Sequence, residues 1–80
     1  MASERQRWHI GDRYYGVTAA STPYSFDLEL SDLGPGVGRG IVAIASMPDG
    51  SKQVNVRFFG DETLPIELIE EFVAEARRRL

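Results

Sequence analysis

The 80-residue chain has nine basic and twelve acidic side chains, a net charge of −3 and no cysteine. Its length corresponds to one domain with a thin core, and the lack of cysteine excludes disulfides, thiolate zinc sites and a cysteine nucleophile. No apolar run approaches the roughly 20 residues that cross a bilayer, and no signal-peptide core follows the polar N-terminus. We expect a cytoplasmic protein with a flexible arm over residues 1–7 and a single domain over residues 8–80.

Aromatic and β-branched side chains dominate residues 8–20, a composition that is typical of a strand. Gly11 and Asp12 indicate a break in this segment, and Gly16 indicates a β-bulge. A turn follows, after which residues 24–30 alternate strictly between apolar and polar side chains. This alternation predicts a second strand with one buried face and one face in water.

Residues 34–40 contain four glycines and one proline, which predicts an irregular loop. The loop leads into residues 41–47, a mostly apolar run that we interpret as a third strand. Asp49 and Gly50 then give the sequence signal of a hairpin turn. The alternating segment over residues 52–59 completes that hairpin as a fourth strand.

The last segment predicts a helix that starts near Pro65. Apolar side chains recur there at spacings of three and four residues, with Phe72 beside them. This apolar stripe consists of Ile66, Ile69, Val73, Ala76 and Leu80. Acidic residues lie towards the start of the segment and three arginines at its end, an order that suits the helix dipole. The stripe requires a second layer against which it can be buried.

Together these elements predict an α+β fold, a four-stranded antiparallel β-meander with one C-terminal helix packed on one face (ββββα). We expect the helix-facing core to contain Phe26, Leu28, Val54, Val56, Phe58, Ile69, Phe72 and Val73. The other face of the sheet carries Ile41, Ala43, Ala45 and Met47 if Val42 and Ile44 point at the helix. This apolar stripe is either an interface or a row of small side chains shaded by longer neighbours.

No group of residues predicts catalysis, a cofactor or a metal site, so we expect a protein that is not an enzyme. The 34–40 loop differs from phosphate-binding loops, because a strand follows it and no Lys-Ser or Lys-Thr pair is present. His9 is the only histidine, which excludes a metal site built from several histidines. The spacing of serine, threonine and acidic residues around His9 does not indicate a catalytic triad. The acidic residues between 61 and 71 are typical of a solvated surface.

We interpret the chain as a small non-enzymatic protein–protein interaction module of the adaptor, inhibitor or antidote type, which acts as a homodimer. The surface for a protein partner is expected at Trp8, Tyr14, Tyr15, Val37, Arg39, Ala43 and Ala45. The alternative is a single-stranded nucleic-acid-binding protein in which Trp8, Tyr14 and Tyr15 stack on bases beside neighbouring arginines. The net charge of −3 argues against this alternative, because nucleic-acid-binding domains usually carry a strong basic footprint. We expect no cofactor and no contact with a membrane.

Overall fold

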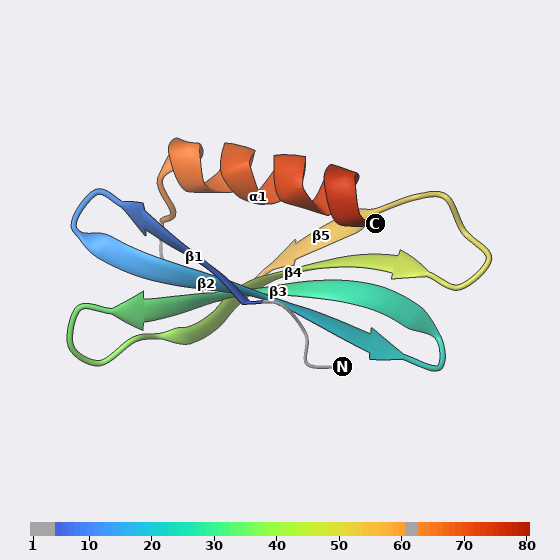
Figure 1. The fold of residues 1–80 in the computed structure, drawn as a ribbon, viewed down its shortest axis with the longest axis horizontal. Helices are drawn as coiled ribbons and strands as arrows, with labels where there is room; N and C mark the ends of the chain where they lie inside the picture. Colours follow the sequence, from blue (N-terminus) through green and yellow to red (C-terminus); the bar gives the residue numbers. More distant parts are fainter. Residues whose placement is uncertain (1–4, 61–62) are drawn as a thin grey trace.

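A computed structural model of the chain describes residues 5–60 and 63–80. It contains an antiparallel sheet and a C-terminal helix (Figure 1). The elements in chain order are β1 (Arg5–Ile10), β2 (Arg13–Thr22), β3 (Ser25–Gly34), β4 (Gly40–Pro48), β5 (Asn55–Phe58) and α1 (Ile66–Arg79). Each strand pairs with the next along the chain, so the sheet order is β1-β2-β3-β4-β5. The expected antiparallel sheet with a C-terminal helix is confirmed, but the sheet has five strands and not four.

The additional strand comes from the segment that the sequence composition presented as one strand. Gly11 and Asp12 form a two-residue turn, and Ile10 on one side of it is paired with Arg13 on the other. Gly11 has a φ of 66°, a conformation that glycine adopts readily and that the first residue of a type II′ hairpin turn requires. Because β1 begins at Arg5, residues 5–7 belong to the sheet and not to a flexible arm. The remainder of the expected arm, residues 1–4, lies outside the described residues.

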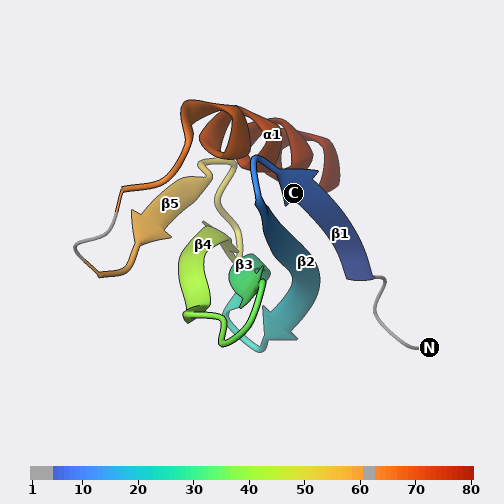
Figure 2. The same ribbon diagram turned by 90° about the vertical axis from the view of Figure 1, so that its left-hand side faces the viewer.

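The sheet curves around the helix. Figure 2 shows α1 lying along the concave side of the sheet, with β1 and β5 rising on either side of it and β3 furthest away. Curvature of this kind follows from the twist of β-strands. The face turned away from α1, which we call the open face, is therefore convex.

The core lies between α1 and the concave face. Tyr15 and Val17 of β2, Leu28 and Leu30 of β3, and Phe72 of α1 are all buried. The expected core is confirmed at Leu28 and Phe72 but is wrong for two other aromatic residues, which are half-exposed: Phe26 at 54% and Phe58 at 49%. A single 14-residue helix is too narrow to cover the whole concave face, so apolar side chains towards its margins stay in contact with water.

The helix buries a stripe that is rotated from the expected one. Leu68, Phe72, Glu75 and Ala76 are its buried residues, whereas Ile66 is 71% exposed. The buried Glu75 carboxylate is paired with two arginines of the last turn, Arg78 and Arg79. A buried charge requires such pairing, because an unpaired charge out of water is costly. The apolar spacing thus predicted the helix correctly and its buried side in part, since Phe72 and Ala76 are buried as expected but Ile66 is not.

Candidate functional site

The open face carries a band of apolar side chains drawn from three strands and from the segment after β5. We call this set the apolar band; its members are Tyr14, Leu33, Ile41, Ile44 and Phe59. Tyr14 is 47% exposed, Ile41 42% and Phe59 39%, while Ile44 is partly buried. Phe59 and Ile44 line one shallow hollow beside Arg57. The band thus places four apolar side chains that are at least 36% exposed, those of Tyr14, Leu33, Ile41 and Phe59, on one face of the sheet.

Two β-bulges create this band. Between β2 and β3 the register shifts, so that Tyr14 is opposite Gly34 and Tyr15 is opposite Asp32. Leu33, between those two partners, folds over Gly16, where an added Cβ would lie 3.2 Å from the Leu33 Cδ1 atom. Because Gly16 has no side chain, it leaves room for Leu33 on the open face. The bulge that was expected at Gly16 therefore lies at Leu33 of the neighbouring strand, and Gly16 itself is paired regularly with Ser31.

The second bulge reverses the expected orientation of β4 from Ala43 onward, while Ile41 lies on the open face and Val42 is buried, as expected. The register shifts between Leu30 and Ser31, so that Leu30 is opposite Ala43 while Ser31 is opposite Ile41. Val42 is the extra residue, and a bulge of this kind interrupts the alternation of side chains between the two faces. Ile41 and Ile44 therefore share the open face although they are three residues apart.

The placement of Ala43 and Ala45 on the open face is wrong. Both alanines are fully buried under α1, where they lie opposite Leu30 and Leu28 of β3. Opposite residues of paired strands share one face of a sheet, and the alternation in β3 fixes which face is buried. Neither alanine can contact a partner of the folded protein. Of the two residues of β4 that were expected at the helix, Val42 is buried in the core, whereas Ile44 lies on the open face.

The three aromatic residues expected at the partner surface do not lie on the same face of the sheet. Tyr14 lies on the open face and stacks on His9, with ring centroids 4.4 Å apart and an interplanar angle of 13°. Tyr15 is buried in the core, and Trp8, its partner in the β1–β2 register, packs against the core from β1. A base-stacking surface built from all three rings is therefore wrong, because only Tyr14 presents its ring on the open face.

Charged side chains flank the apolar band. Glu29 of β3 is opposite Ile44 of β4, and Arg57 of β5 is opposite Ile44 from the other side. Asp27, further along β3, accepts a 2.6 Å hydrogen bond from the Ser46 hydroxyl group. Among residues 5–60 and 63–80, neither Glu29 nor Arg57 forms a salt bridge within the chain. Glu29 and Arg57 thus place two charges of opposite sign, neither in a salt bridge, on either side of Ile44.

The glycine-rich loop between β3 and β4 is anchored by a buried carboxylate, that of Asp32. Arg13 donates from Nε and Nη2 to the two Asp32 oxygens at 3.1–3.3 Å, and the Gly34 N–H donates to Oδ1 at 3.0 Å. Arg39, at the far end of the loop, donates to Oδ2. Burial by itself raises the pKa of Asp32, but the hydrogen bonds from Arg39, Arg13 and Gly34 outweigh it and leave the pKa below its ordinary value of 3.8.

The loop backbone is also tightly packed against β3. A Cβ atom added at Gly38 would overlap the carbonyl group of Asp32, so no other residue fits there without movement of the backbone. Val37, at the tip of the loop, is 94% exposed. Arg39 is held on Asp32 and is only partly exposed, so its charge is engaged within the protein. Of the two loop residues expected at the partner surface, Val37 is exposed to solvent, whereas the side chain of Arg39 is paired with Asp32.

Sequence reasoning missed Asp32 as the organising residue of this loop. One signal was available, because an Asp two residues before a glycine commonly accepts the N–H group of that glycine in an Asx-turn. The two arginines could not have been assigned to it from the sequence, since Arg13 lies 19 residues away on another strand. Their pairing depends on the β2–β3 register, which the bulge at Leu33 sets.

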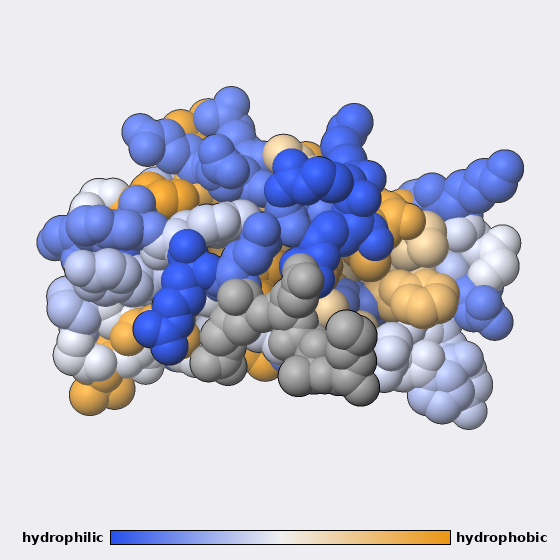
Figure 3. Space-filling view, in the orientation of Figure 1, coloured by the Kyte–Doolittle hydropathy of each residue, from blue (hydrophilic) through white to orange (hydrophobic). Residues whose placement is uncertain are grey.

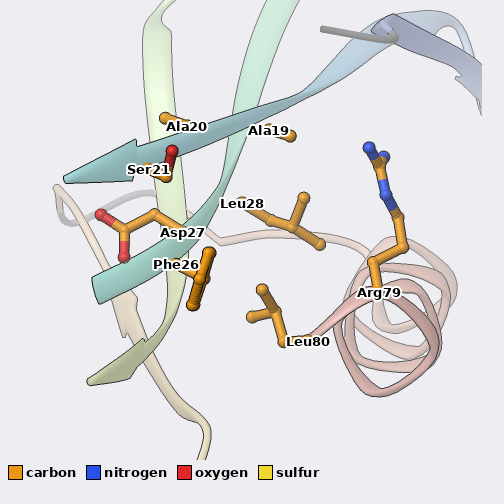
Figure 4. A pocket seen from close by; sticks show the side chains of 8 residues that line it. All are labelled: Ala19, Ala20, Ser21, Phe26, Asp27, Leu28, Arg79 and Leu80. Atoms are coloured by element: carbon orange, nitrogen blue, oxygen red, sulfur yellow. The ribbon is translucent and has the colours of Figure 1, made fainter. Parts of the chain in front are cut away.

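A separate shallow hollow of about 270 Å³ lies between the β2–β3 hairpin and the C-terminal end of α1. Figure 4 shows Phe26, Leu28 and Leu80 around it, with the charged ends of Asp27 and Arg79 directed to opposite sides. In the space-filling view of Figure 3, apolar surface is visible beside the C-terminal end of α1. The charged groups do not converge on one point of this hollow, so it lacks the geometry of a catalytic or ligand site.

Within the part of the chain that the structure describes, no three potential metal-ligating side chains lie together. Of the acidic residues between 61 and 71, Asp61 and Glu62 lie outside the described residues, and Glu67, Glu70 and Glu71 are exposed on α1. No helix in residues 5–60 and 63–80 has both the length and the apolar character needed to cross a membrane.

Comparisons of this chain with protein-family models, with curated proteins and with solved structures give no match.

Proposed function

We propose that this chain is a small, non-enzymatic protein–protein interaction module of the cytoplasm that acts as a homodimer through the open face of its sheet. The observation that carries the proposal is the apolar band, in which Tyr14, Ile41 and Phe59 are each at least 39% exposed on one face. Contiguous exposed apolar surface on a small domain marks an interaction site more often than a free surface.

The size of the open face sets an upper limit on the area that two copies can bury through their sheets. The strands contain 6, 10, 10, 9 and 4 residues, which rise roughly 3.3 Å per residue and lie about 4.8 Å apart, so the face covers on the order of 600 Å². Stable interfaces bury about 800 Å² on each partner. Because the face is convex, two copies touch mainly over the central strands, where Leu33, Ile41 and Ile44 lie, so the contact between the two sheets is smaller than the whole face.

The charges on the open face also favour a second copy. Two-fold symmetry places the same surface on both subunits, so each charge can meet the opposite charge of its partner. Glu29 and Arg57 have opposite signs and no salt-bridge partner among the described residues of their own chain. A small core also gains from association, because a domain of this length buries a modest fraction of its surface alone.

The test is sedimentation of the wild type and of the Ile41→Asp variant. We expect the wild type to sediment at about twice the 8.9 kDa mass of one chain at tens of micromolar. The Ile41→Asp variant should weaken the dimer by about 100-fold, because it buries an unpaired charge at the contact. A wild type that remains monomeric at several hundred micromolar, with a cooperative thermal transition, would overturn the proposal.

The matched control is Ile66→Asp, which makes the same change on α1, in the layer opposite the open face. Ile66 is 71% exposed, and a negative charge in the first turn of a helix is tolerated. This variant should dimerise like the wild type. Equal weakening by the two variants would show that the open face is not the contact surface.

A further inference from the structure

Hydrogen bonds and backbone packing hold both ends of the loop between β3 and β4. Gly34 and Arg39, near its two ends, both donate to the buried Asp32 carboxylate, and Gly38 packs against the β3 backbone. A glycine-rich segment loses more conformational entropy on ordering than other segments. Interactions that hold such a loop in the free protein therefore remove that cost from any later binding step.

The loop also projects on the side where a partner would lie. Figures 1 and 2 both show it at the end of β3 and β4, further from α1 than the middle of the sheet is. Leu33 and Ile41, which belong to the apolar band, lie beside its two ends in the sequence. Val37, at its tip, is 94% exposed. A second copy that lies on the open face would therefore meet this loop.

We infer that the β3–β4 loop is a preformed part of the dimer contact, with Val37 as its apolar contact residue and Asp32 as the residue that holds it in position. This inference rests on the proposed dimer and extends it from the sheet to the loop. In a two-fold pair the loop of each subunit packs against the open face of the other, so each dimer contains the contact twice.

The first test compares Val37→Ser with Ile66→Ser by sedimentation over a range of concentrations. Both variants shorten an exposed β-branched side chain, and neither residue is part of the core, so both should fold. Val37→Ser should raise the dimer dissociation constant at least about tenfold, since burial of a valine at each of two sites is lost. Ile66→Ser should leave it unchanged.

The second test measures whether Asp32 acts through the loop. In the Asp32→Asn variant, amide exchange of residues 36–38 in the monomer should be faster than in the wild type, while exchange in the strands β2 and β3 should stay protected. The dimer should also weaken. In the double variant with Val37→Ser, the loss of dimerisation free energy should be smaller than the sum of the losses in the two single variants, because both substitutions act on one contact.

The outcomes separate the inference from the function on which it rests. If the wild type does not self-associate, both fail, and the sedimentation of the wild type alone shows it. If the wild type is a dimer that Ile41→Asp disrupts, but the Val37→Ser and Ile66→Ser variants have the same dimer dissociation constant, the sheet contact stands and the loop contact is wrong. If Asp32→Asn does not fold, the comparison of Val37→Ser with Ile66→Ser still decides the loop contact.

Discussion

At the scale of single residues, Asp32 connects more of the structure than any other polar side chain described. It joins Arg13 at the start of β2, Arg39 at the end of the loop and the backbone of Gly34. A buried carboxylate without partners is costly, but one that accepts several charge-assisted hydrogen bonds is stabilising in its ionised form. The charged state of Asp32 and the closed form of the loop therefore support each other.

This linkage predicts a pH dependence of stability. Because the pKa of Asp32 in the folded protein is lowered from 3.8, its contribution is complete above the unfolded value and is lost as the pH falls through the folded value. At pH 7, Asp32→Asn should lower the free energy of unfolding by roughly 2 kcal/mol, the usual loss for a hydrogen bond to a charged group. Urea unfolding of both proteins between pH 7 and pH 2 provides the measurement. The difference in the free energy of unfolding between the wild type and Asp32→Asn should narrow only below about pH 4. A constant difference over the whole pH range would contradict the role given to the carboxylate.

At the scale of elements, the sequence pattern predicted most of the strands and the helix, but not the face on which each residue lies. The alternation in residues 24–30 placed Leu28 correctly, because β3 is regular there. The β4 strand has few polar side chains to mark its outer face, and its bulge at Val42 shifts the alternation by one residue. A bulge depends on pairing with a neighbouring strand, so the orientation of Ala43 and Ile44 could not be derived from the segment itself.

The same reasoning applies to the first hairpin and to the candidate site. Gly11 and Asp12 were recognised as a break, but the turn between β1 and β2 follows only if both flanking segments pair. Of the residues expected at a partner surface, the structure exposes Tyr14 and Val37 and buries Tyr15. Neighbouring aromatic residues in one strand point to opposite faces, and the sequence alone did not say which of the two is inside.

The packing of α1 on the sheet predicts unequal costs for two phenylalanine substitutions. Phe72 is fully buried, so Phe72→Ala should lower the free energy of unfolding by roughly 3–5 kcal/mol. That change would remove most of the stability of a domain of this size, which is on the order of 5 kcal/mol. Phe26→Ala should cost clearly less, because that ring is 54% exposed beside the hollow at the end of α1. Thermal and urea unfolding compare the two variants, and a Phe72→Ala protein with the wild-type midpoint would show that α1 does not pack as described.

At the scale of the whole molecule, one curved sheet and one helix divide the chain into a buried concave face and an open convex face. The helix covers the apolar core residues of the concave face. The apolar band on the convex face stays in contact with water. The loop anchored by Asp32 extends that second face beyond the sheet. A second copy of the chain would bury the apolar band and the β3–β4 loop together. Dimerisation would therefore explain the thin core, the exposed band and the position of the loop.

The most direct test of this account is an isotope-filtered NOE measurement on an equimolar mixture of ¹³C-labelled and unlabelled protein, which detects contacts between copies only. The account predicts intermolecular NOEs from the methyl groups of Leu33, Ile41, Ile44 and Val37, and none from the buried methyl groups of Ala43 and Ala45. Intermolecular NOEs confined to α1, or none at a concentration of several hundred micromolar, would contradict the claim that the open face is the surface through which this protein associates.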